Sequence, residues 1–258
     1  MTLDACAALV ERGDPDRFAA CMAAPVAARA RLWPLYALNL DLARVPWRTR
    51  EPLLAEMRLE WWRGALADAA RGVVVPGHAV LVPLAALLAE ADLPLAVLDR
   101  LALARRWDIW SAPFADRAAF DAYLDDTAGG LMWLAARALG APDAAEPVVR
   151  NAGWAMGLAG FLRAVPELAA RGRVPLLDSR PEAVAALARD GLARLDDARR
   201  NRRAVPVAAT PALLAGWQSG ALLALVADDP ARVAEGRVQR SEFARRGGLL
   251  WAAVSGRW

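Results

Sequence analysis

The spacing of the apolar residues is what most constrains this sequence. They recur every three or four positions along most of the chain, and no segment alternates with the two-residue period of a half-buried strand. Alanine, leucine and arginine favour helices and are abundant, whereas isoleucine occurs only at Ile109. The pattern therefore predicts an all-α protein.

The expected helices are separated by short segments that contain proline or glycine. Asp14 and Pro15 fit the cap and first turn of a helix that ends near Met22. Further helices are predicted at about 25–44 (with a kink at Pro34), 49–70, 79–91, 94–107, 116–139, 143–170, 181–203, 211–227 and 238–254. In the 116–139 helix, the spacing predicts one buried stripe formed by Phe120, Leu124, Thr127, Leu131, Leu134 and Ala138. Because no repeat or long polar linker interrupts the chain, we expect a single domain over residues 1–258.

Charge and cysteine content narrow the class of protein. All 32 basic residues are arginines, set against 29 acidic residues, and they form no stripe suited to nucleic acid, so no nucleic-acid partner is expected. Cys6 and Cys21 lack metal-site spacing and are expected to be free thiols. The N-terminus does not resemble a signal peptide, which favours a cytoplasmic location.

Two uncharged segments, 72–89 and 204–227, are about long enough to cross a membrane. Both contain prolines, and the first also contains Gly77 and His78. These interruptions favour a loop followed by a buried helix over a membrane span.

Four stretches carry a resemblance to a known family. They are "LYALNLDLARV" (35–45), "EMRLEWWRGAL" (56–66), "FDAYLDDTAGGL" (120–131) and "GFLRAVPELAARGRVPLL" (160–177). In order and approximate spacing they resemble the squalene/phytoene synthase family. The resemblance implies an isoprenoid-synthase-like helical bundle with a central cavity. It also implies that active members condense two prenyl diphosphates, using Mg²⁺ held by two aspartate-rich motifs.

This chain departs from the family pattern in both aspartate-rich motifs. The positions that the resemblance expects to be acidic hold Ala43, Arg44, Trp47, Ala164 and Leu168. Asp41 is offset from the first motif, and Glu167 is the only acidic residue left in the second. Because Mg²⁺ binds through oxygen ligands, we expect no metal site, no cofactor and no catalytic residue. Mg²⁺ would be needed only if the chain were an active transferase.

The amino-acid sequences of two motifs, "ALNLDLARV" and "FLRAVP", resemble those of a divergent branch of the family that lacks the aspartate-rich motifs. That branch includes an assembly factor of mitochondrial respiratory complex I and its bacterial relatives. The resemblance implies a pseudoenzyme whose partner is a complex I subunit or assembly intermediate, at the inner membrane surface. Two alternatives stay open: a head-to-head prenyl transferase, and a protein that binds an isoprenoid or lipid in the cavity without chemistry.

The second motif keeps its basic residues, Arg163, Arg171 and Arg173. Guanidinium groups suit phosphate or carboxylate, so these are candidate anion-binding residues, and reversal of their charge is expected to leave the fold largely intact. Arg163, Glu167 and Arg171 also fall on one helix face, where a ladder of exposed ion pairs explains them equally well.

The other candidates face the expected cavity. Arg58 lies four residues before Trp62 and is expected to project into the cavity, and Tyr36 and Asn39 face the same way from the preceding helix. Tyr123 matches a tyrosine of the family motif. Structural hydrogen bonding is an equal alternative for these polar groups. Asp108, in "RRWDIW", is expected to form an ion pair with a neighbouring arginine.

Eleven tryptophans are many for a chain of this length, and several lie beside arginines. Such pairs occur in cores, at protein interfaces and at the headgroup level of a membrane surface. The sequence leaves these three interpretations open, including peripheral membrane contact.

Overall fold

The computed structural model describes residues 3–110 and 112–258, and every regular element in that part of the chain is helical. Its helices are α1 (Leu3–Gly13), α2 (Pro15–Ala23), α3 (Val26–Arg44), α4 (Pro52–Ala70), α5 (Leu81–Glu90), α6 (Leu95–Leu103), α7 (Arg106–Trp110), α8 (Arg117–Leu124), α9 (Gly130–Ala138), α10 (Glu146–Ala170), α11 (Pro181–Arg200), α12 (Thr210–Leu213), α13 (Ser219–Asp228), α14 (Ala231–Ala234) and α15 (Glu242–Ser255). Short turns of 3-10 helix, η1 (Val45–Trp47), η3 (Asp143–Ala145), η4 (Arg202–Ala204), η5 (Val207–Ala209) and η6 (Leu214–Gly216), and one π-helical turn, η2 (Asp125–Gly129), join them.

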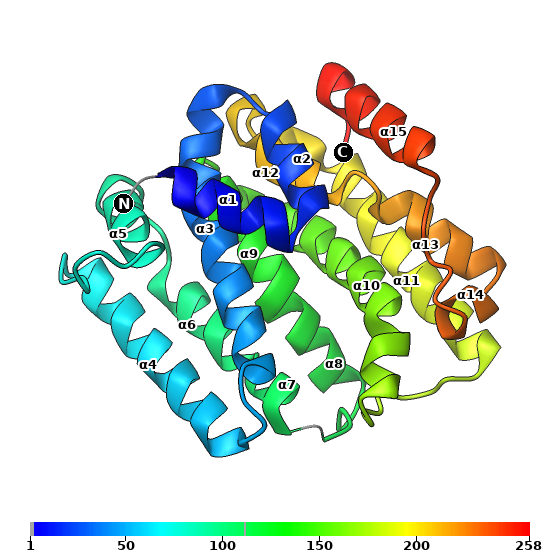
Figure 1. Ribbon diagram of the computed structural model, residues 1–258. Helices are drawn as coiled ribbons and strands as arrows, with labels where there is room; N and C mark the ends of the chain where they lie inside the picture. The colour runs from blue at the N-terminus through cyan, green and yellow to red at the C-terminus, as the bar shows by residue number, and fades with distance from the viewer. Residues whose placement is uncertain (1–2, 111) are drawn as a thin grey trace.

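The helices form one bundle around α9 and α10 (Figure 1). Helices α4, α5 and α6 flank one side, α11 and α13 flank the other, and α1, α2 and α15 lie across one end. The largest cluster of buried apolar residues runs through the whole bundle, from Cys6 in α1 to Trp258. The all-α prediction is therefore confirmed.

Helix boundaries follow the local signals in most places. Asp14 caps α2 as predicted, because its Oδ1 accepts a hydrogen bond of 2.9 Å from the Arg17 backbone N–H. Helix α4 begins at Pro52, a few residues after the predicted start at Thr49, whose hydroxyl accepts a hydrogen bond from the Glu51 N–H. Helix α1 was not predicted, and the 94–107 helix is divided into α6 and α7.

The predicted stripe lies in the core. All six of its residues are buried, although the 116–139 helix is interrupted by the π-helical turn η2. At this turn α10 approaches very closely: a Cβ added to Gly153 would lie 2.8 Å from both the Ala128 carbonyl oxygen and the Gly129 Cα. Glycine at 153 therefore allows two backbones to touch at the centre of the bundle.

The apolar 204–227 region is not one straight helix. It is broken into η5, α12, η6 and α13, and α13 packs against α10 and α11. Within the described residues, Val207–Asp228 is the only stretch whose length and hydropathy would suit a membrane span, and half of its apolar window is buried in the bundle. The other segment, 72–89, is a loop followed by the ten-residue helix α5, as predicted.

Both thiols are expected to be chemically silent in the folded protein. Cys6 and Cys21 are free and buried, and burial raises their pKa values to about 11 and about 12. We expect no reaction with Ellman's reagent at pH 8, and release of two equivalents of chromophore once guanidinium chloride unfolds the chain. Stoichiometric reaction of the folded protein within minutes would contradict this burial.

Candidate functional site

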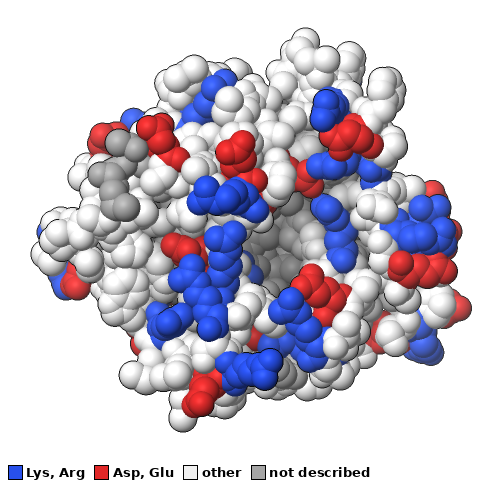
Figure 2. Space-filling model, viewed as in Figure 1, with Lys and Arg blue, Asp and Glu red and all other residues white. Residues whose placement is uncertain are grey.

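A hollow opens at the centre of the bundle, and arginine side chains gather on both sides of its mouth (Figure 2). Its main cavity, of about 270 Å³, lies between α3, α7, α8, η2 and α10. A second cavity of about 200 Å³ shares Arg17, Ala128, Gly157 and Gly160 with the first. A third of about 370 Å³ shares Trp47, Ala164 and Leu168. We call these three connected spaces the hollow.

Four of the five replaced metal-ligand positions face this hollow, whereas Arg44 does not line it. Ala43 lines it from α3, Trp47 from η1, and Ala164 and Leu168 from α10. Asp41, the offset acid, does not line it; its Oδ1 accepts a hydrogen bond of 3.2 Å from Arg48. Helices α3 and α10 therefore present methyl and isobutyl groups, and the turn η1 an indole, where the resemblance expects carboxylates.

The carboxylates that do line the hollow are each paired with an arginine. The pairs are Asp14–Arg17 at 2.5 Å, Asp16–Arg163 at 3.3 Å, Asp108–Arg105 at 3.4 Å and Glu167–Arg171 at 2.5 Å. In residues 3–110 and 112–258, no three His, Cys, Asp or Glu side chains cluster as metal ligands would. The donor set of the hollow therefore does not fit the Mg²⁺ ions that the family implies.

A buried polar network forms one wall of the hollow. The Tyr123 hydroxyl donates to the Asp108 carboxylate at 3.1 Å, and Arg105 donates to Asp108, Tyr123 and Asn39. Burial raises the pKa of Asp108, while the Arg105 guanidinium opposes this shift. Burial and the neighbouring Asp108 carboxylate raise the pKa of Tyr123. The ion pair predicted for Asp108 is thus present, and its partner is Arg105.

The candidates that sequence reasoning placed in the cavity lie at different depths. Asn39 and Tyr123 line the hollow, as predicted, and both belong to the buried network. Tyr36 is buried beneath the Arg17 guanidinium, which lies 5.1 Å from its ring centroid, and does not line the hollow.

The placement predicted for Arg58 is wrong. Arg58 is exposed on the outer face of α4 and does not line the hollow. The buried face of α4 is set by Ala55, Leu59 and Trp62. Arg58 lies roughly 40° round the helix from Trp62, beyond Ala69 at the edge of the buried face and on the solvent side.

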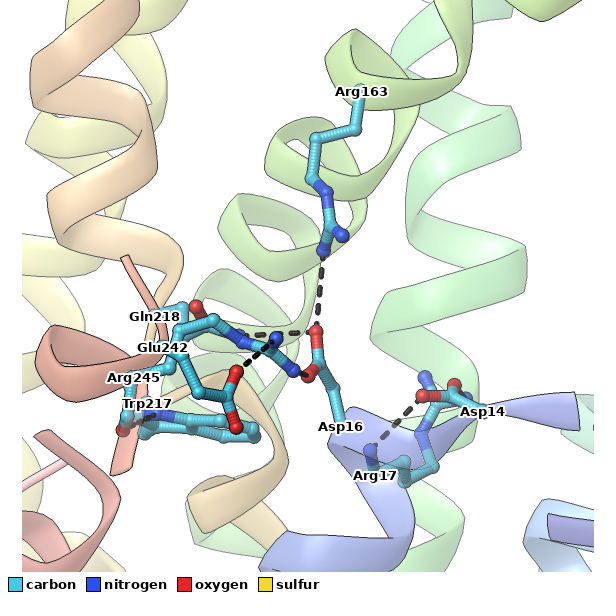
Figure 3. A network of polar contacts seen from close by, with 8 residues as sticks. All are labelled: Asp14, Asp16, Arg17, Arg163, Trp217, Gln218, Glu242 and Arg245. Carbon is cyan, nitrogen blue, oxygen red and sulfur yellow. Dashed lines mark hydrogen bonds and ion pairs between the residues drawn. The ribbon is translucent and has the colours of Figure 1, made fainter. Parts of the chain in front are cut away.

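Arg163 belongs to a network that centres on Asp16 (Figure 3). One Asp16 oxygen accepts hydrogen bonds from Arg163 at 3.3 Å and from Gln218 at 3.0 Å, and the other is paired with Arg245 of α15. The predicted ladder is therefore only half formed: Glu167 pairs with Arg171, whereas Arg163 turns to a carboxylate in α2. Arg163 and Arg171 both line the hollow.

Arg173 differs from the other two arginines of its motif because it is buried. Its guanidinium donates hydrogen bonds to the backbone carbonyls of Trp107 and Asp108 and lies over the Trp47 ring at 5.2 Å. Arg171 also lies over the Trp47 ring, at 4.4 Å from its centroid, and remains exposed. The prediction that reversing all three charges would spare the fold is therefore revised, since a carboxylate at 173 would face two carbonyl oxygens.

Sequence reasoning missed three residues of the site, Arg17, Arg105 and Asp16. Arg105 had a local signal, because it lies three residues before Asp108 on the same helical turn. Arg17 follows the cap residue Asp14 by the same interval. Asp16 had no such signal, since its partners Arg163, Gln218 and Arg245 are 147 to 229 residues away.

Comparison with known proteins agrees with this geometry. The squalene/phytoene synthase family profile matches residues 10–176, about two thirds of the chain. A dehydrosqualene synthase structure is similar, with a TM-score of 0.82 at 15% identity, over 98% of this chain and 95% of that one. Squalene synthase HpnC from Alicyclobacillus acidocaldarius has a TM-score of 0.77 at 18% identity, over 89% and 94%. No curated protein sequence matches significantly. The chain belongs to the squalene/phytoene synthase family, because the family profile matches most of the chain and the fold is shared with these structures.

Proposed function

We propose that this protein is a non-catalytic member of its family and acts as an assembly factor for respiratory complex I. The proposal that the protein is non-catalytic rests on one observation: Ala43, Ala164 and Leu168 occupy positions that face the hollow. Departure of a diphosphate develops concentrated negative charge, which Mg²⁺ held by carboxylates would neutralise. These three side chains offer no oxygen to a metal ion.

The charge balance of the hollow supports the same proposal. Its arginines, Arg17, Arg105, Arg163 and Arg171, are matched one to one by carboxylates, so its lining carries no net charge. A diphosphate would have to displace these carboxylates from their arginines before it could bind. Such a lining is poorly suited to a substrate that carries several negative charges.

The proposed role in complex I assembly rests on the amino-acid sequences of two motifs, "ALNLDLARV" in α3 and "FLRAVP" in α10. The proposed partner is a complex I subunit or assembly intermediate, met at the cytoplasmic surface of the inner membrane. The fold supplies a rigid bundle for such a role, and the role needs no chemistry in the hollow.

A second candidate function is binding of an isoprenoid or another lipid. It is favoured by the apolar part of the cavity wall, where Leu124, Leu131 and Phe161 line the main cavity. A lipid chain could enter this space without the metal that a diphosphate requires. Prenyl transfer itself is the least favoured function, because the donor set does not fit Mg²⁺.

The test is deletion of the gene, followed by assays of membrane NADH:quinone oxidoreductase activity and of squalene- and phytoene-type products. We expect loss of most oxidoreductase activity with isoprenoids unchanged, and recovery when the wild-type gene is restored. The purified protein, given farnesyl diphosphate and Mg²⁺, is expected to form no condensed product. Normal oxidoreductase activity in the deletion strain would contradict the assembly role, and product formation would contradict the non-catalytic role.

An Ala164→Phe variant separates the two leading functions, because phenylalanine at this position fills part of the hollow. Restoration of complex I activity by this variant supports a role that does not need the hollow. Failure to restore it, together with lipid that co-purifies with the wild-type protein only, supports the lipid-binding function.

A further inference from the structure

Helix α15 is amphipathic, but its large apolar side chains face the solvent, unlike those of an ordinary surface helix. Ala252 is its only fully buried residue, whereas Phe243, Leu250 and Val254 are 88%, 66% and 78% exposed. At about 100° per residue these three side chains lie within roughly 40° of one another, on the side opposite Ala252. The small residue faces the bundle and the large apolar residues face away, although burial normally orients a helix the other way.

The apolar surface continues beyond these three residues. Trp251, 64% exposed, lies at one edge of the same face. Val207, 87% exposed, lines a groove of about 500 Å³ beside Val254, between α12 and the end of α15. Figure 1 shows α15 at the rim of the bundle. Exposed apolar groups that are contiguous in this way mark interaction surfaces.

The charges around this face are biased toward one sign. Arg202 and Arg257 line a second groove with Trp251, and the Arg240 guanidinium lies beside Gly248 of α15. In the described part of the chain, no carboxylate lies within 4.0 Å of Arg202, Arg240 or Arg257. Glu242 is the only acidic residue of α15, and it is already paired with Arg245 and Arg246. The apolar face is therefore bordered by cations that are free to meet negative charge.

We propose that α15 docks this protein on an anionic bilayer, with Phe243, Leu250 and Val254 at the level of the acyl chains and the bordering arginines at the phosphates. A helix with large apolar groups on one face, tryptophan at its edge and arginines alongside has the composition of an interfacial helix. Guanidinium groups on long stems reach the headgroups while the ring and aliphatic side chains are buried. This proposal does not depend on the proposed role in complex I assembly.

The anionic lipid is favoured over a protein partner by a comparison within the molecule. Helix α4 also exposes apolar side chains, at Leu53, Leu54 and Met57, but the charges near them are mixed. Glu56 pairs with Arg106, and Glu60 pairs with Arg63. Among the described residues, Arg50 and Arg58 near these side chains also have no carboxylate within 4.0 Å, but Glu51, Glu56 and Glu60 lie among them, whereas Glu242 is the only acidic residue of α15. The α4 surface therefore carries mixed charge and supplies the control.

The experiment is co-sedimentation of the full chain with vesicles of phosphatidylglycerol and phosphatidylcholine, compared with phosphatidylcholine alone. We expect binding to the anionic vesicles, weakened by salt. The variant Phe243→Ser/Leu250→Ser/Val254→Ser should bind about tenfold or more weakly. Arg202→Gln/Arg257→Gln should bind roughly fivefold more weakly per arginine removed. The control Leu53→Ser/Leu54→Ser/Met57→Ser should bind as wild type does.

Several outcomes would overturn the proposal. They are failure of the wild type to bind anionic vesicles, unchanged binding by the α15 variant, or equal loss in the α4 control. A wild-type dimer that the α15 variant converts to a monomer, without vesicle binding, would assign the face to a second copy. If the triple variant fails to fold, quenching of tryptophan fluorescence by brominated lipid is the deciding measurement. The lipid should quench the wild-type protein, and it should quench the Trp251→Phe variant less. Equal quenching of the two proteins would contradict the docking.

Discussion

Replacing Asp108 with alanine is expected to lower the free energy of unfolding by about 3–5 kcal/mol. Asp108 is buried and pairs with Arg105, whose side chain is only 14% exposed. Removing the carboxylate leaves the guanidinium buried with neutral partners, Asn39 and Tyr123, and deprives the tyrosine hydroxyl of its acceptor. Urea unfolding followed by circular dichroism measures the loss.

The control is Asp99→Ala, which removes the partner of Arg63 in an ion pair of 2.6 Å near the surface. Both side chains of this pair are more exposed, at 30% and 42%, so its loss should cost at most about 1 kcal/mol. In a double-mutant cycle, Asp108→Ala with Arg105→Met should cost less than the sum of the single changes, because no charge is then left alone. Equal costs for Asp108→Ala and Asp99→Ala would show that the buried network contributes little.

Replacing Gly153 with alanine is expected to cost about 1–3 kcal/mol through overpacking. The added methyl carbon would lie 2.8 Å from the Gly129 Cα and the Ala128 carbonyl oxygen, so backbone atoms, not side chains, would have to move. Alanine normally stabilises a helix relative to glycine, which makes the sign of the effect informative. Thermal melting of the purified variant is the measurement.

Gly160 provides the matched control on the same helix, α10. A Cβ added at Gly160 would meet nothing within 4 Å, and the residue is exposed. Gly160→Ala should therefore raise stability by about 0.5–1 kcal/mol, the ordinary difference in helix propensity. If both variants shift the melting temperature upward, α10 and the π-helical turn are not in close contact.

The fold could be predicted because its signal is repeated many times along the chain. The stripe from Phe120 to Ala138 passes from Leu124 to Leu131 through Thr127 in steps of three and four residues, so the helical period continues across the π-helical turn without revealing it. In the structure, the Thr127 hydroxyl donates to the Tyr123 carbonyl at 2.6 Å within this turn. Helix α1 escaped prediction because only Cys6 and Val10 are buried in it, too few to establish a period.

The site was less predictable, since it depends on rotation about helix axes and on distant pairs. Spacing placed Arg58 and Trp62 on one face, but the difference of roughly 40° between them is enough to put the arginine in solvent. The burial of Arg173 depends on carbonyls of α7, 65 and 66 residues away, which no local pattern can specify. Of the five positions that the family resemblance supplied, Ala43, Trp47, Ala164 and Leu168 line the hollow and Arg44 does not, so the resemblance supplied most of the three-dimensional neighbours that spacing alone lacks.

The contact between α10 and the π-helical turn η2 has a consequence for how this cavity changes over evolutionary time. Gly157 and Ala128 both line the hollow, and a Cβ at Gly157 would lie 2.6 Å from the Ala128 Cβ. Enlargement of the side chain at 157 would collide with the opposite helix before it could fill the space. The close crossing of α10 and η2 therefore preserves the volume of the hollow, because a substitution at 157 that would fill it is blocked by Ala128.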